Sequence, residues 1–122
     1  MNKQYTATEN QEQQALFEWA ETMANRHPEL NLMFHIPNGG KRHIKTAVQL
    51  KAEGVKSGVP DICLPVSKGS YHGLFIEMKR KGGKTSGNQD KWLALLSEQG
   101  YRACVCIGWE QAAQKIISYL SL

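Results

Sequence analysis

The chain has 122 residues, of which 41% are hydrophobic and 21% charged. This length suits one domain, because a single core needs roughly 100–150 residues and a second core would have too few left. The composition excludes the weakly hydrophobic, highly charged class of disordered proteins. No apolar run reaches the ~18–20 residues of a membrane span, and the N-terminus has no apolar signal segment. We expect one domain over residues 1–122, located in the cytoplasm.

The net charge of +4 is distributed unevenly along the chain. Between Lys41 and Lys91 there are eleven Lys and Arg against four acidic residues, a balance of +7, which leaves −3 for the remainder. A concentrated positive charge predicts a polyanionic partner, most often nucleic acid. A basic surface that only meets solvent would explain the same distribution.

In the first half of the chain the pattern predicts two helices with a short strand between them. Residues 9–26 carry apolar side chains at helical spacing, after Thr residues that can cap a helix. A strand is expected over 32–36, and the Pro-Asn-Gly-Gly turn that begins at Pro37 closes it. A second helix is expected over 43–53, with Gly54 as its C-terminal cap.

The second half predicts a hairpin and a crossover. Residues 61–66 and 72–79 read as two antiparallel strands joined by a polar turn. A capping-box spacing at Ser86 starts a helix that runs to Gly100, a strand follows over 102–107, and an amphipathic helix ends the chain. This alternation predicts an α/β fold with a central mixed sheet flanked by helices, in which the last strand pairs in parallel after its crossover.

The second strand of the hairpin carries the residues best suited to chemistry. Side chains alternate along a strand, so Glu77 and Lys79 share one face. Asp61 starts the partner strand, and two carboxylates at one sheet edge are what a Mg²⁺ or Mn²⁺ site needs. The backbone carbonyl of Met78 would add a third oxygen, and Lys79 would orient the attacking water and offset phosphate charge. A surface Glu–Lys pair, worth a few tenths of a kcal/mol, explains the same spacing without chemistry.

Taken in order, the motifs resemble the VRR-NUC family of PD-(D/E)xK nucleases, over about residues 9 to 120. The matching pieces are Ile36-Pro37-Asn38-Gly39-Gly40, Leu50-Lys51-x-x-Gly54-Val55, Gly58-Val59-Pro60-Asp61, Phe75-Ile76-Glu77-Met78-Lys79, Ser86-x-x-Gln89 and Gly100-Tyr101. The resemblance implies a restriction-endonuclease-like core and metal-dependent cleavage of nucleic acid. For small stand-alone members of phage or bacterial type it also implies homodimers that act on branched DNA, in a bacterial or phage-infected cytoplasm.

Matched position by position, the resemblance assigns a role to each residue of the site. It implies that Asp61 and Glu77 are metal ligands and Lys79 the catalytic lysine, that Glu12 is the acidic residue of the first helix, and that Gln89 is the glutamine after the core. The family's name refers to Val-Arg-Arg, whereas this chain has Met78-Lys79-Arg80-Lys81.

Glu12 and Gln89 each have a second interpretation. Glu12 lies on the apolar stripe of its helix and is expected to point toward the site, although an acidic residue in a first turn also stabilises the helix dipole. Gln89 sits at the capping-box position of the third helix, which explains it without chemistry.

Glycine and basic residues on two loops are expected to contact phosphate, because glycine allows close backbone approach and cations neutralise the phosphate. These residues are Asn38, Gly39, Gly40, Lys41, Arg42, His43, Lys45, Arg80, Lys81 and Lys84.

Three classes of function remain open at this stage. A metal-dependent nuclease, a non-catalytic DNA-binding module and an interaction protein with an incidental motif all fit parts of the pattern. Carboxylates inside the most basic segment would repel phosphate unless a cation lies between them, which favours the enzyme. A zinc site is not expected, since no CxxC or HxxxH pair is present, and the three cysteines predict no disulfide framework. Within the enzyme class, a homodimeric four-way-junction nuclease and a monomeric flap nickase are both considered.

Overall fold

The computed structural model describes residues 6–37 and 44–122. The elements, in chain order, are α1 (Glu9–Met23), a 3₁₀ helix η1 (Pro28–Leu32), β1 (Phe34–His35), α2 (Ile44–Ala52), β2 (Ile62–Leu64), β3 (Leu74–Lys79), α3 (Gly87–Glu98), β4 (Arg102–Ile107) and α4 (Trp109–Leu120). No helix in these ranges is long and apolar enough to cross a membrane.

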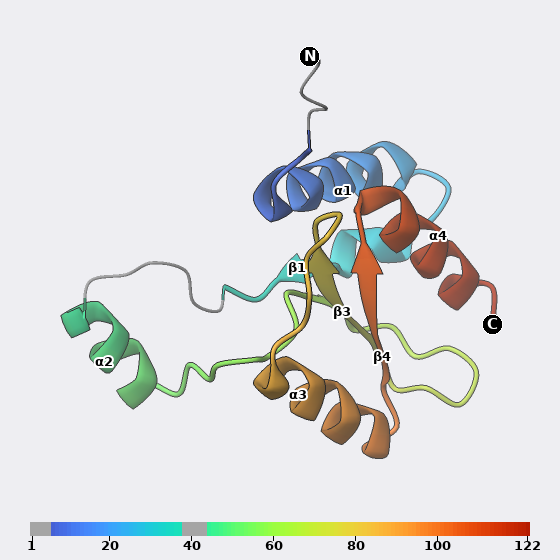
Figure 1. Cartoon of the computed structure of the whole chain (residues 1–122). Helices are drawn as coiled ribbons and strands as arrows, with labels where there is room; N and C mark the ends of the chain where they lie inside the picture. The colour runs from blue at the N-terminus through green and yellow to red at the C-terminus, as the bar shows by residue number, and fades with distance from the viewer. Residues whose placement is uncertain (1–5, 38–43) are drawn as a thin grey trace, which may run out of the picture.

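One four-stranded sheet, in the order β1-β2-β3-β4, forms the centre of the molecule (Figure 1). The β1–β2 and β2–β3 pairs are antiparallel, whereas β3 and β4 are parallel. The predicted mixed sheet, the antiparallel hairpin and the parallel last strand are thereby confirmed.

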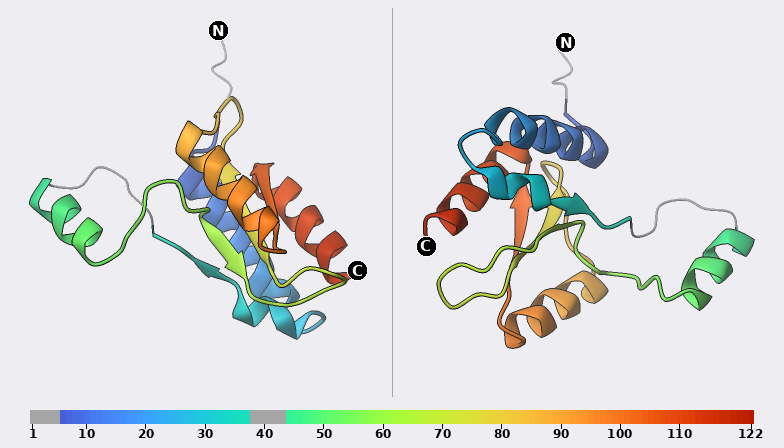
Figure 2. Two further views of the ribbon diagram at one scale, coloured as in Figure 1. Left: turned by 90° about the horizontal axis from the view of Figure 1, so that it is seen from below. Right: turned by 180° about the vertical axis from the view of Figure 1, so that it is seen from behind.

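Two faces of the sheet are covered by different helices (Figure 2). Helices α1 and α4 lie together on one face, where Leu16 of α1 and Ile116 of α4 join Ile76 and Met78 of β3 in the buried core. Helix α3 lies on the other face, and none of its residues is buried. Burying apolar side chains is the main favourable term in folding, so the α1/α4 face contributes most of the stability.

Helix boundaries follow the local signals closely at two N-termini. Thr8 and Ser86 each cap their helix in a complete capping box, with Gln11 and Gln89 as the reciprocal partners. The predictions near residues 24–33 were wrong in detail. Helix α1 ends at Met23, before Arg26, and Leu32 belongs to η1, because Pro28 is compatible with the first turn of a new helix as well as with the end of an old one.

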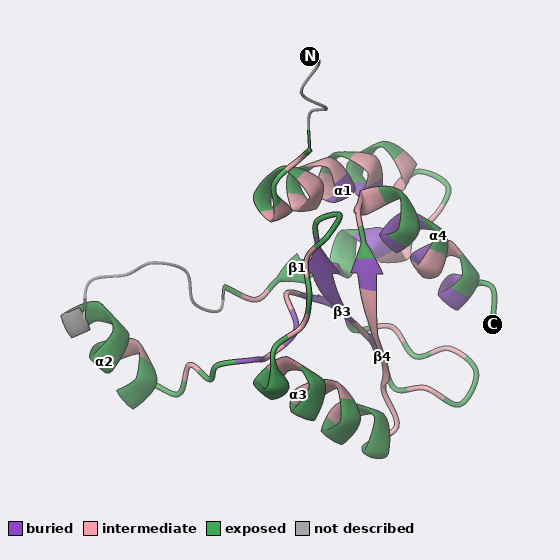
Figure 3. Ribbon diagram, in the orientation of Figure 1, coloured by how far each residue is buried: buried purple, intermediate pink, exposed green. Residues whose placement is uncertain are grey.

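Helix α2 lies apart from the rest of the molecule (Figure 1). Its described side chains are nearly all exposed, and the exposed fraction of Val48 is 65% (Figure 3). The helix was predicted from its sequence, but its separation from the sheet was not.

Candidate metal-dependent catalytic site

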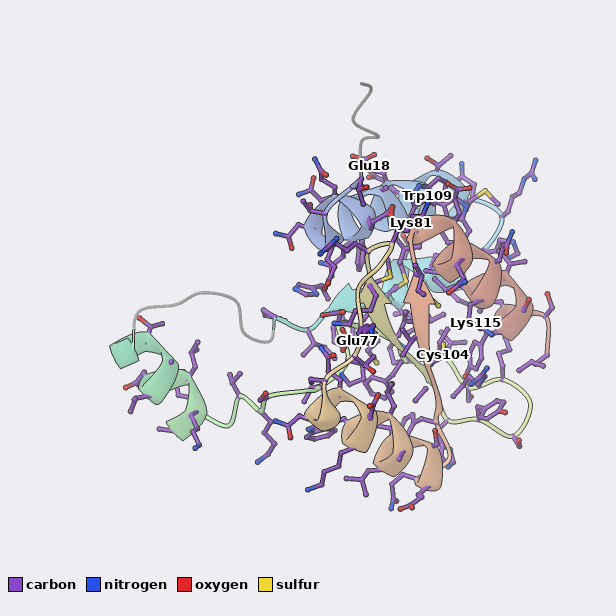
Figure 4. All side chains as sticks on the ribbon, in the orientation of Figure 1. Glu18, Glu77, Lys81, Cys104, Trp109 and Lys115 are labelled. Carbon is purple, nitrogen blue, oxygen red and sulfur yellow. The ribbon has the colours of Figure 1, made fainter. Side chains whose placement is uncertain are left out.

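The candidate site lies where β2 begins and β3 ends. The antiparallel register pairs Ile62 with Ile76, and continued by one residue it brings Asp61 opposite Glu77. The predicted meeting of these two carboxylates is therefore present in the fold. Figure 4 shows Glu77 inside the body of the molecule, far from α2.

Asp61 is held in place by the backbone around it. Its Oδ2 accepts a hydrogen bond of 2.8 Å from the Met78 N–H, and its own carbonyl accepts one of 2.7 Å from the Ile36 N–H. His35 Nδ1 lies 2.8 Å from the same carbonyl. These contacts orient the carboxylate toward β3 before any ligand is bound.

Glu77 is buried, with an exposed fraction of only 1%. Burial, followed by a hydrogen bond with Asp61 and the Asp61 charge, raises its pKa from 4.5 to about 9. Its Oε1 is buried without a hydrogen-bond partner. An unsatisfied buried carboxylate oxygen is costly, and a divalent cation in contact with it would remove that cost.

Met78 offers its carbonyl to the same place. The Met78 N–H points at Asp61, and the C=O of a strand residue points to the same side as its N–H. Continuing the β2–β3 register places Pro60 opposite Met78, and proline has no N–H to donate to that carbonyl. Asp61 thus supplies one metal ligand. Pro60, which lies opposite Met78, has no N–H to donate to the Met78 carbonyl, so this oxygen receives no hydrogen bond from Pro60.

Lys79 is more enclosed than expected. Its side chain has an exposed fraction of 9%, and its Nζ lies 3.7 Å from Glu77 Oε2 and 3.9 Å from Glu9 Oε1. The expectation that Asp61, Glu77 and Lys79 would all be partly exposed was wrong for Glu77 and Lys79, because the start of α1 covers the end of β3. The alternative of a surface Glu–Lys pair does not fit this burial.

Glu9 is the acidic residue of α1 that faces the site directly, and sequence reasoning missed it. Its signal was its position in the first turn of α1, one helical turn before Glu12. The side chain of Glu12, also in α1, instead reaches the start of α4, where its Oε1 accepts a weak hydrogen bond of 3.5 Å from the Trp109 N–H. The adjacent Gly108 N–H donates to the Lys79 carbonyl at 2.9 Å, so Glu12 contacts the turn that adjoins Lys79.

Gln89 does not reach the carboxylates by hydrogen bonds that the structure records. Its Oε1 accepts a hydrogen bond of 2.8 Å from the Ser86 N–H, as the capping-box interpretation requires. Arg80, Lys81 and Lys84 are exposed on the loop that leads to α3. Asn38, Gly39, Gly40, Lys41, Arg42 and His43 lie outside the described residues, as does the side chain of Lys45.

The donor set suits a hard divalent cation and does not suit zinc. Two carboxylates and a backbone carbonyl are oxygen donors of the kind Mg²⁺ and Mn²⁺ prefer. Within the described residues there is no group of three or more His, Cys, Asp or Glu side chains that could hold a metal, so water and substrate oxygens would complete the coordination. The three cysteines, Cys63, Cys104 and Cys106, are free.

Comparison with known proteins finds both a family model and a solved structure that match the chain. The family model of the VRR-NUC domain matches residues 2–109. A solved structure described as a "VRR_NUC domain protein" is similar to this chain with a TM-score of 0.83 and 27% identity, covering 96% of this chain and 91% of that one. No curated protein matches the chain.

Proposed function

Because the chain belongs to the VRR-NUC family of nucleases, which act on DNA, we propose that it is a Mg²⁺- or Mn²⁺-dependent endonuclease that cleaves branched DNA as a homodimer. The observation that carries the proposal is the pairing of the Asp61 and Glu77 carboxylates beside the enclosed Lys79. Two adjacent carboxylates reduce the stability of the fold unless a cation binds between them.

The cation would be held by Asp61, Glu77 and the Met78 carbonyl. The unpartnered Glu77 Oε1 supports this assignment, because its burial is unfavourable without a positive partner. A divalent ion bound there supplies Lewis acidity toward the phosphate and a lower pKa for its water. The chain's own carboxylates would bind the ion and keep it at the end of β3, next to Lys79.

Lys79 is the residue we propose to act on the reacting atoms. Its Nζ lies between Glu77 and Glu9, which limit its motion and keep it next to the carboxylates. An ammonium held there stabilises negative charge that develops on the phosphate and donates a hydrogen bond that orients the attacking water.

Glu12 and Gln89 are proposed as positioning residues. Glu12 contacts the β4–α4 turn, whose Gly108 N–H is bound to the Lys79 carbonyl, so it supports the strand end that carries the lysine. Gln89 fixes the first turn of α3 and, with it, the loop that carries Arg80, Lys81 and Lys84. These three exposed cations are proposed to contact DNA phosphates, together with the basic residues between Asn38 and Lys45.

The homodimer and the junction preference rest on symmetry. The described residues of one chain offer the candidate site at Asp61 and Glu77, and resolving a four-way junction requires two symmetry-related incisions. A two-fold pair of chains supplies two sites and doubles the basic surface.

The free cysteines are consistent with the cytoplasm, a reducing compartment, as the place of the reaction.

The test is a cleavage assay on linear, nicked, flapped, single-stranded and four-way-junction DNA, with Mg²⁺, Mn²⁺ or EDTA. We expect metal-dependent cleavage, fastest on the junction, and none by an Asp61→Asn variant. Activity in excess EDTA would contradict metal dependence, and equal rates on duplex and junction would contradict structure selectivity. Light scattering tests the assembly: a mass near 13.7 kDa with full activity would exclude the homodimer in favour of a monomeric nickase.

A further inference from the structure

A second apolar cluster lies outside the buried core, between β3 and α3. It lines a cavity of about 440 Å³, to which Ile36, Val55, Val59, Phe75, Trp92 and Leu96 contribute. None of these six belongs to the core or packs against it, and all six are only half-buried. The volume lies in the range of small-molecule sites, roughly 300–1,000 Å³.

The cavity adjoins the candidate catalytic site. Phe75 precedes Glu77 by two residues on the same face of β3, and Val59 precedes Asp61 by two residues. Two residues along a strand span about 6.6–6.8 Å. A nucleotide whose phosphate lies at the carboxylates can therefore place its own base, or that of its neighbour, in the cavity.

The lining has the chemistry of a stacking site. Trp92 and Phe75 present aromatic rings, and Tyr101 holds the Phe75 ring from its edge, with ring centres 5.2 Å apart and planes at 75°. Lys56 and Glu53 also line the cavity, and the Lys56 cation can contact the backbone phosphate of the same nucleotide. An apolar wall with aromatic rings and a lysine beside it is typical of surfaces that bind unpaired bases.

We propose that this cavity between β3 and α3 receives an unpaired nucleobase of the DNA strand whose phosphate lies at Asp61 and Glu77. The proposal rests on the proposed nuclease function and explains its structure selectivity. A base within a duplex must leave its stack to enter the cavity, whereas a base at a branch or in a flap is already unpaired, so entry costs less free energy.

The experiment uses the whole protein with Ca²⁺ in place of Mg²⁺, so that a cation can lie between the carboxylates and the phosphate while cleavage is suppressed. The probes are flapped duplexes with the fluorescent base 2-aminopurine at the first, second or third unpaired position, and a matched blunt duplex. Trp92→Ala removes the large ring, Trp92→Phe keeps an aromatic ring, and Leu95→Ala is the matched control on the same helix, since Leu95 is exposed and does not line the cavity.

We expect the native protein to quench 2-aminopurine at one flap position. Trp92→Phe and Leu95→Ala retain the quenching, and Trp92→Ala loses it and weakens flap binding about tenfold more than duplex binding. Quenching that survives Trp92→Ala, or equal weakening on flap and duplex, would overturn the proposal. Circular dichroism and the thermal midpoint of each variant show that it is folded.

The same variants distinguish a nucleobase in the cavity from a second copy of the chain. They also distinguish failure of the base site from failure of the proposed nuclease function. If Trp92→Ala leaves flap binding intact but lowers the molar mass in solution from twice 13.7 kDa to 13.7 kDa, a second copy of the chain covers the cavity, and the proposal is wrong. Cleavage of flaps in Mg²⁺ without 2-aminopurine quenching would overturn the base site but not the nuclease. Quenching without cleavage in any metal would overturn the nuclease function but not the base site.

Discussion

The two faces of β3 have opposite properties, although they alternate residue by residue along one strand. Ile76 and Met78 are buried in the apolar core together with residues of α1 and α4. On the other face, Phe75 lines an open cavity, Glu77 carries an unpartnered buried oxygen, and Lys79 is enclosed by two carboxylates. One face stabilises the fold, whereas the other carries buried charged groups whose burial is unfavourable without a ligand.

The sharpest test of this contrast is Glu77→Gln, which keeps the shape of the side chain and removes its charge. We expect cleavage to fall by orders of magnitude, because a neutral amide is a poor ligand for Mg²⁺. The measurement is single-turnover cleavage of junction DNA at saturating Mg²⁺. A rate within a few-fold of the native rate would mean that Glu77 does not bind the ion.

The same variant should change the pH dependence of stability in metal-free protein. The pKa of Glu77 is about 9 in the fold against an ordinary 4.5. Between these values the folded state keeps a proton that the unfolded state has lost, so the free energy of unfolding falls as pH rises from about 4.5 to about 9. Urea unfolding in EDTA should show this decline in the native protein and a flatter profile in Glu77→Gln, which is then the more stable of the two at pH 8.

On the packed face, Ile76→Ala should reduce the free energy of unfolding by about 2–5 kcal/mol, because it leaves a cavity in the core. Urea unfolding at pH 7 measures the loss. Phe75→Ala is the matched variant on the open face, where solvent can fill the space, and its loss should be smaller. Equal losses would show that both faces of β3 are packed alike.

The close packing of the segment before β2 against the start of α3 can be tested at Gly58. This glycine has φ +93°, and an added Cβ would lie 2.7 Å from the backbone carbon of Asn88 at the start of α3. Gly58→Ala should therefore lower stability by about 1–3 kcal/mol and slow cleavage, since Asp61 follows three residues later. Gly87→Ala is the control, because nothing lies within 4 Å of its added Cβ. An unchanged thermal midpoint in Gly58→Ala would contradict the close approach.

The smallest effect is expected for the exposed lysines of the loop after β3. Lys81→Gln and Lys84→Gln should each reduce the slope of log affinity against log salt by about 1, because each removes one phosphate contact. Lys115→Gln on α4, on the packed side of the molecule, is the control and should leave the slope unchanged. The slope is measured by fluorescence anisotropy in EDTA with junction DNA at several salt concentrations. If all three variants behave alike, the loop does not contact DNA.

Local pattern was enough for much of this protein. Alternation along β3 put Glu77 and Lys79 on one face, and the hairpin brought Asp61 opposite Glu77. The capping-box spacing at Ser86 marked the start of one helix, and the threonines before residue 9 marked the start of another. Each of these depends on residues close in sequence or on one strand pairing, which is why the element order and the meeting of the Asp61 and Glu77 carboxylates could be predicted.

Only the tertiary structure decided what surrounds those residues. The packing of α1 against β3 encloses Lys79 and selects Glu9 as its partner, while Glu12 is directed to the start of α4. The placement of α3 leaves the cavity beside Phe75, and α2 stands away from the sheet. Helical periodicity identifies an apolar stripe but not the distant segment that covers it, because that choice depends on how all the elements fill space together.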